Sequence, residues 1–394
     1  MPIIKTLVKA TKLEKEKFTI PKSVQDAIPI QRIWPDGIFQ VGSRFSKTFS
    51  FTDINYQIAG KEDKTAMFLD YSELLNALDS GASAKITINN RKINKAEFEK
   101  SLLLPMKEDG LNHFRKEYNE MLLSKVTGTN NSVVQDRYIT ITVAKRNIDE
   151  ARTYFSRVGT DLITHLSQLS SIGRELDAGT RLQVFRDFFK GNEPADFAFD
   201  LKEQMKKGHN FKDWLCPDSM EFQKDHFRLN DRWGRVLYLQ GYASYIKDSM
   251  IAELCDMDRS LMLSIDILPV PTDEAVREIQ NKLLGVETNA ANWQRKQNAA
   301  NNFSAVLPYD MEQQRKEAKE FLDDLVSRDQ RMMFAVITFV HTADSKAQLD
   351  QDTEALLTTA RKHLCQFGVL KFQQLDGLNT VLPIGARRIN AFRT

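Results

Sequence analysis

The segments "GRVLYLQGY" (Gly234–Tyr242) and "SLMLSIDILPV" (Ser260–Val270) flank a third segment, "SYIKDSMIAELCD" (Ser244–Asp256). The two outer segments are apolar runs of strand length, bounded by glycine and proline, and both patterns are typical of buried strands. The middle segment spaces its apolar residues as an amphipathic helix does. This stretch therefore predicts a β-α-β unit.

A second β-α-β unit follows about sixty residues later. Its expected elements are the strand "RMMFAVITFVH" (331–341), a helix over 345–366 and the strand "GVLKFQQL" (368–375). Two such units in succession form the split βαβ (ferredoxin-like) pattern, whose central connection is stretched here over residues 272–330. A structureless loop of that length is unusual in a compact domain, so we expect a projecting helical arm.

The first half has a similar order of elements. We expect a β-hairpin around "VGSRFSKTFSFTD" (41–53), the strands "SAKITINNR" (83–91) and "RYITITVAK" (137–145), a helical stretch over 95–126 and an amphipathic helix from Ile148 to Leu169. The predicted fold class is α+β, with two lobes. At least the second lobe is a split βαβ sheet with a long helical insertion between its central strands.

These patterns divide the chain into three parts. We expect a basic N-terminal arm over residues 1–35, a first α/β lobe over 36–225 and a second lobe over 226–394 that carries the arm 272–330. The N-terminal arm is basic because the first 22 residues hold six lysines against two glutamates.

The composition indicates an ordinary soluble chain. It has 394 residues, 42% hydrophobic and 27% charged, with a net charge of +2, which gives no case for nucleic-acid binding by overall charge. The three cysteines contain no C-x-x-C pair, so neither a disulfide framework nor a cysteine zinc cluster is indicated, and a reducing cytoplasm fits. The apolar stretch 332–343 is too short to span a bilayer.

Catalytic motifs are missing from the sequence. Lys47-Thr48 looks like the end of a phosphate-binding loop, but Gly42 is out of register and no glycine precedes the lysine. His209, Cys216 and His226 have irregular spacing for a metal site. We therefore predict no catalytic, cofactor-binding or metal-binding residue in this chain.

Aromatic residues supply the candidates for partner contacts. Trp293 lies in a polar stretch of the expected arm, where it has few apolar neighbours, and an exposed aromatic of this kind is typical of an interface. Phe39 and Phe45 of the hairpin region are the other two candidates. Packing of Trp293 on a neighbouring helix is the alternative.

Several strings resemble one known family. "DGIFQVGSRFSKTFSFTDINYQ", "EDKTAMFLDYSELLNALDSG", "KITINNR" and "RYITITVAK" are similar to the amino-terminal region of the VirB-four-type conjugative-transfer ATPase, in the form carried by conjugative transposons of Gram-positive bacteria. The closing string "LDGLNTVLPIGARRINAFRT" resembles the segment that this family places just before its motor domain. The resemblance covers nearly the whole chain but includes no catalytic motif.

The resemblance implies a role in a type IV secretion system, in DNA transfer by conjugation. By it, the chain is a non-catalytic docking and assembly domain on the cytoplasmic face of the plasma membrane. Its expected partners are its own motor domain after residue 394, inner-membrane subunits of the transfer channel and other copies of itself, with no direct nucleic-acid contact. ATP and magnesium are expected only in that motor.

Two alternatives from other functional classes remain open. The chain could be a single-strand nucleic-acid-binding module that stacks bases on Phe39, Phe45, Phe49 and Phe51 beside Arg44 and Lys47. It could also be an enzyme with an unrecognised carboxylate site, for which no residue pair stands out.

Overall fold

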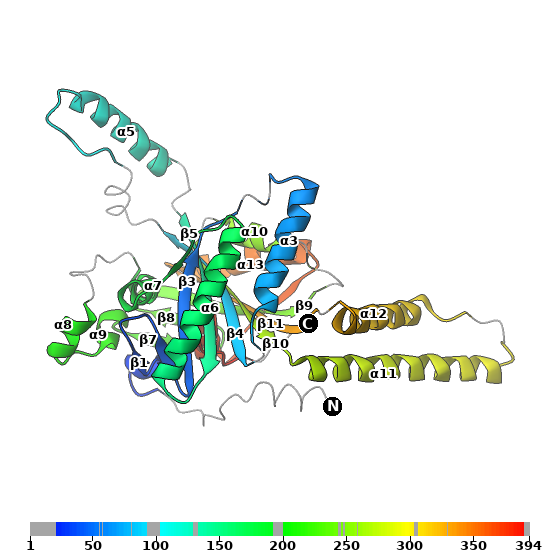
Figure 1. Cartoon of the computed structure of the whole chain (residues 1–394). Coiled ribbons are helices and arrows are strands. Elements are labelled where there is room, and N and C mark those ends of the chain that lie inside the picture. Colours follow the sequence, from blue (N-terminus) through cyan, green and yellow to red (C-terminus); the bar gives the residue numbers. More distant parts are fainter. Residues whose placement is uncertain are drawn as a thin grey trace.

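The computed structural model describes residues 21–389, except residues 55, 57, 80, 93–102, 129–132, 192–199, 243–245, 247–248, 258, 303–305 and 329. Within these ranges, twelve strands form one antiparallel sheet, combined with helices. The predicted α+β class is confirmed. Figure 1 shows the sheet at the centre of the molecule, with α5 and the α11–α12 pair pointing away from it.

The same order of elements occurs twice along the chain. The first half contains β1 (Arg32–Ile33), β2 (Phe39–Val41), β3 (Arg44–Phe51), α3 (Lys61–Asn76), β4 (Ala82–Lys92), α5 (Asn112–Gly128), β5 (Val133–Ala144), α6 (Ile148–Gln168), β6 (Gly173–Glu175) and α7 (Ala178–Lys190). The second half contains β7 (Met220–Phe222), β8 (Phe227–Leu229), β9 (Arg232–Gly241), α10 (Ser249–Cys255), β10 (Leu261–Pro269), α11 (Thr272–Ala299), α12 (Tyr309–Val326), β11 (Met333–Ala343), α13 (Lys346–Lys362), β12 (Gln366–Val369) and α14 (Gln374–Val381). Three short helices complete the described elements: α2 (Val24–Ala27), α8 (Leu201–Lys206) and α9 (Phe211–Leu215).

The lateral order of strands is also repeated. It is β6-β3-β5-β4 in the first half and β12-β9-β11-β10 in the second, and every pair is antiparallel. The two halves join where β4 pairs with β10, from Asn90 opposite Leu261 to Ala84 opposite Ile267. The sheet is therefore continuous through the boundary between the halves.

The helices α3, α6, α10 and α13 cover one face of the sheet, and α7, α14 and the segments beside them cover the other. In β9, Leu237 packs in a core with α10 and α13, whereas its neighbour Val236 packs on the opposite face with α7 and α14. In the first half, α3 and α6 pack on the same face as α10 and α13. Successive side chains of a strand point to opposite faces, so both faces of these strands are buried.

Several local predictions differ from the structure. The helical stretch expected over 95–126 begins at Asn112, while residues 103–111 contain Pro105 and Gly110 and are not helical. Residues 95–102 lie outside the described ranges. Segment 24–33, expected in a basic arm, instead packs in the core through Ile28 and Ile30.

The arm between β10 and β11 consists of two helices that run side by side (Figure 1). Its base is packed by a small apolar cluster that includes Val270, Ile279 and Leu325. Farther out, residues 291–300 of α11 are exposed or half-buried. The polar stretch of the arm therefore stays out of the core of the sheet.

Candidate functional site

A polar and fully buried surface lies where the two halves of the sheet meet. In the β4–β10 pair, Lys85 is directly opposite Asp266, and Thr87 is directly opposite Ser264. All four side chains are buried, and the hydroxyls of Thr87 and Ser264 are 3.0 Å apart. Buried polar groups in native proteins have hydrogen-bond partners, so a polar element has to cover this face.

Residues 380–389 provide that cover, and we call them the C-terminal strap. They leave the end of α14 and cross the polar face. Side chains of β3, β4, β10 and α7 donate hydrogen bonds to six backbone carbonyls of the strap, those of Thr380, Val381, Leu382, Pro383, Ile384 and Ala386. The strap is thus fixed mainly through its backbone.

Lys85 is the central donor. Its ammonium donates to the carbonyl oxygens of Thr380, Leu382 (3.2 Å) and Ala386 (3.0 Å). Thr380 lies in the last turn of α14, where carbonyls lack intrahelical partners and a cation is favoured by the helix dipole. Lys85 also lies 3.5 Å from the carboxylate of Asp266.

Burial acts on both members of this ion pair. It lowers the pKa of Lys85 and raises the pKa of Asp266, because loss of hydration disfavours each charged form, while the opposite charge of the partner counteracts both shifts. Arg387 of the strap is also buried, and its charge favours the ionised form of Asp266. The site is therefore a cluster of buried charges.

Arg181 of α7 fixes the strap from the other side. Its side chain is 0% exposed and donates to the carbonyl oxygens of Gly37 (2.9 Å), Ser46 (2.7 Å) and Pro383 (2.9 Å), and to the hydroxyl of Ser46 (2.8 Å). The guanidinium carbon lies 4.0 Å from the centre of the Phe39 ring. Burial lowers the pKa of Arg181 to about 9, so it stays a cation at neutral pH.

Gly385 allows the strap to approach the sheet closely. Its φ is +80°, in the left-handed region that favours glycine. A Cβ added at this position would lie 2.5 Å from the Cβ of Ser46. The strap can therefore take this path only with glycine here.

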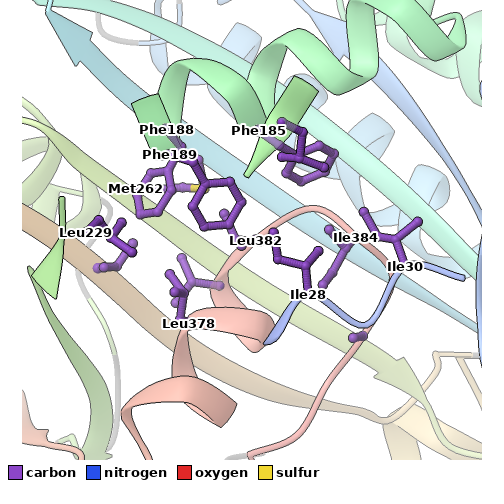
Figure 2. Close-up of a cluster of buried hydrophobic side chains, with 14 of the residues drawn as sticks. Ile28, Ile30, Phe185, Phe188, Phe189, Leu229, Met262, Leu378, Leu382 and Ile384 are labelled. Atoms are coloured by element: carbon purple, nitrogen blue, oxygen red, sulfur yellow. The ribbon is translucent and has the colours of Figure 1, made fainter. Parts of the chain in front are cut away.

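Apolar side chains of the strap complete the contact. Figure 2 shows Leu382 and Ile384 among residues from distant parts of the chain, including Ile28, Ile30 and Phe185. The ammonium of Lys85 and the two terminal nitrogens of Arg181 donate to carbonyl and hydroxyl oxygens of the protein itself. The arrangement therefore positions a segment of the chain on the sheet.

Two of the three predicted contact residues are not on the surface. Phe39 is 0% exposed and packs on the face that carries the strap, and Phe45 is 4% exposed and packs with α3 and α6 on the other face. The prediction that they contact a partner is wrong, because both are needed in the cores. Phe49 is also fully buried, so these three rings cannot stack on bases.

Lys47 and Thr48, which resemble part of a phosphate-binding loop, lie in the middle of β3. The ammonium of Lys47 is 2.5 Å from a carboxylate oxygen of Glu175, and the hydroxyl of Thr48 is 2.9 Å from that of Thr140. The predicted hairpin is confirmed, with β2 and β3 joined at Gly42-Ser43. A regular strand cannot wrap a phosphate with its backbone N–H groups, because these pair in the sheet.

Trp293 lies in the outer part of α11 and is half-buried. It lies on the projecting arm, outside the cores of the sheet. The assignment stays a prediction.

The other candidates for chemistry are separate in space or paired. Among the described residues, no group of three or more His, Cys, Asp or Glu side chains could hold a metal ion. His209 contacts Gln204, Cys216 packs in a core and His226 contacts Asp225. These three residues are not brought together.

A cleft of about 450 Å³ opens between the halves on the helical side of the sheet. Its lining combines apolar side chains such as Ile58 and Ile251 with an ion pair between Arg137 and Asp53, which are 2.7 Å apart.

In the part of the chain that the structure describes, every helix is too short or too polar to cross a membrane.

No protein-family model matches the sequence, and no curated protein matches it.

Proposed function

We propose that this chain is a non-catalytic docking and assembly domain of a conjugative type IV secretion ATPase, and that it couples the motor to the inner-membrane transfer channel. The family resemblance of the sequence is the starting point. The strand orders β6-β3-β5-β4 and β12-β9-β11-β10 support a split βαβ (ferredoxin-like) arrangement in each half, with a helical insertion between the central strands of the second.

The C-terminal strap is the observation that carries the proposal. By resemblance, the segment from Leu375 onward precedes the motor domain of the family. Here residues 380–389 of that segment lie at the junction of the two halves, mostly buried, and are hydrogen-bonded to β3, β4, β10 and α7. A motor attached beyond it would act on both halves of the sheet through this one segment.

The proposed partners are protein surfaces. They are the motor domain, inner-membrane subunits of the channel and other copies of this chain, which would hold the domain on the cytoplasmic face of the plasma membrane. Co-purification from cells that carry the complete transfer system tests this. Recovery of the intact protein without any inner-membrane subunit, after chemical cross-linking, would contradict the docking role.

The purified chain is expected to hydrolyse no ATP. The segment around Lys47 resembles part of a phosphate-binding loop, but it forms a strand. It therefore offers no cradle for the β- and γ-phosphates. Steady-state phosphate release is the measurement. Turnover that follows the protein peak through further purification would contradict the non-catalytic reading.

Trp293→Ala is expected to weaken assembly while leaving the melting temperature nearly unchanged. Truncating an anchoring tryptophan typically costs about 2 kcal/mol of binding free energy, which is about thirtyfold in affinity. Self-association and binding to channel subunits are the quantities to measure. Leu284→Ala, which removes an exposed apolar side chain nearer the base of α11, is the matched control. A lower melting temperature with unchanged assembly would make Trp293 a packing residue.

A further inference from the structure

The strap is bound in the way that a protein binds a peptide. Its carbonyl groups accept hydrogen bonds from side chains, and no strand of the sheet pairs with it in the described residues. Its apolar side chains, such as Leu382 and Ile384, enter a core built by other elements. Backbone recognition with a few side-chain pockets is the usual mode for an extended peptide.

The rest of the sheet has cores that do not include the strap. The cluster beneath α3 and α6 and the cluster beneath α10 and α13 contain no residue from 380–389. Only the core on the strap's own face uses Leu382, Ile384, Ala386 and Ile389. Departure of the strap would therefore leave the face beneath α3, α6, α10 and α13 packed in both halves.

Buried charges at this contact favour departure of the strap. Lys85 and Asp266 lie beneath the strap and Arg387 belongs to it; they are 2%, 4% and 8% exposed, and all three would regain water once the strap left. Oδ2 of Asp266 has no hydrogen-bond partner among the described residues. Removing ions from water is unfavourable and is only partly offset by their pairing, so this site holds the strap less firmly than an apolar site of the same size would.

We propose that the polar face of the sheet is a binding site for an extended peptide segment, and that its occupant is the chain's own strap, residues 380–389. The strap leaves and returns while the two helix-covered halves remain folded. This property belongs to the chain whether or not the chain serves a secretion ATPase.

Release can be measured on the full chain by limited trypsin digestion under native conditions. Arg387 is buried, so cleavage after it requires the strap to leave the sheet. Mass spectrometry measures the loss of the residues that follow Arg387, and the rate of this loss reports the rate of opening. Hydrogen–deuterium exchange of the same sample shows whether β9 and β11 open at the same time.

Gly385→Ala should release the strap selectively. The strained φ and the 2.5 Å approach to Ser46 both disfavour a Cβ at this position in the seated strap. We expect cleavage after Arg387 to accelerate by about tenfold or more, as 1.4 kcal/mol of differential strain would give. Gly285→Ala is the control, because an added Cβ there meets nothing within 4 Å.

Thr380→Val is a milder second variant. It removes the hydroxyl that accepts from the backbone N–H groups of Arg388 (2.9 Å) and Ile389 (3.2 Å), with little change of shape. Faster exchange confined to residues 374–389, with β9 and β11 still protected, is the expected result for both variants. The proposal is wrong if strap residues of the unmodified chain exchange only at the rate of global unfolding, or if Gly385→Ala prevents the whole protein from folding.

Discussion

Arg181→Met is expected to lower the free energy of unfolding by about 3–5 kcal/mol, because it removes a fully buried charged donor from several acceptors at once. The carbonyl oxygens of Gly37, Ser46 and Pro383 would lose the guanidinium that now donates to them. Native proteins are stable by only about 5–15 kcal/mol, so the loss would be a large fraction of the total. Urea denaturation followed by circular dichroism measures it.

Arg361→Met is the matched control, since Arg361 is exposed near the end of α13. It should change stability by about 0.5 kcal/mol or less. Arg181→Lys should recover under half of the lost free energy of unfolding. A single ammonium cannot reach all the acceptors that the two terminal nitrogens of the guanidinium reach. If Arg181→Met is as stable as Arg361→Met, Arg181 does not hold the strap in place.

The regular elements could be predicted because their signals are local. The helix expected from Ile148 to Leu169 is observed as α6, from Ile148 to Gln168, and its N-cap Asn147 accepts a hydrogen bond from the N–H of Glu150 at 2.9 Å. The strand expected over 260–270 is β10, which ends at Pro269. Apolar spacing and capping chemistry lie within a few residues of each other, so sequence alone contains them.

The candidate site could not be predicted, because it depends on contacts between distant segments. The alternation in "SAKITINNR" predicts a strand but does not show that Lys85 and Thr87 are buried beneath a strap about 300 residues later in the chain. Nothing in the spacing of Lys85 says which element will cover it. Lys85 has apolar neighbours in its strand and lies directly opposite Asp266. This pairing can be recognised only once the register of the two strands is known.

The segment after α13 differs from the prediction for a local reason. The sequence predicts one strand over residues 368–375, but β12 ends at Val369 and α14 begins at Gln374. Phe372 between them has a φ of +60°, which turns the chain away from the sheet. The turn contains neither glycine nor proline, so the usual signals of a strand end are missing.

Acid is expected to destabilise the protein through His341, at higher pH than carboxylate protonation alone would. This histidine lies in β11, is 1% exposed, and its Nε2 is 3.0 Å from the hydroxyl of Thr353. Burial, followed by the nearby charges of Arg235 and Arg259, lowers the pKa of His341 to about 3. The unfolded chain would protonate the same group with an ordinary pKa of about 6.5.

The sign follows from which state takes up the proton. Between pH 6.5 and about 3 the unfolded state binds it and the folded state does not, so stability is complete above pH 6.5 and falls with decreasing pH. At pH 5 the contribution lost is about 2 kcal/mol, from 1.36 kcal/mol for each pH unit below 6.5.

His341→Gln separates this contribution from that of other groups. A glutamine amide can still donate toward Thr353 but takes up no proton, so the variant should be somewhat less stable at pH 7 and lose about 2 kcal/mol less than the unmodified chain between pH 7 and pH 5. Urea denaturation at half-unit pH steps gives both curves. Parallel curves would mean that His341 is hydrated in the folded protein, contrary to its burial between β11 and α13. Converging curves would identify one buried imidazole as the group that limits stability in mild acid.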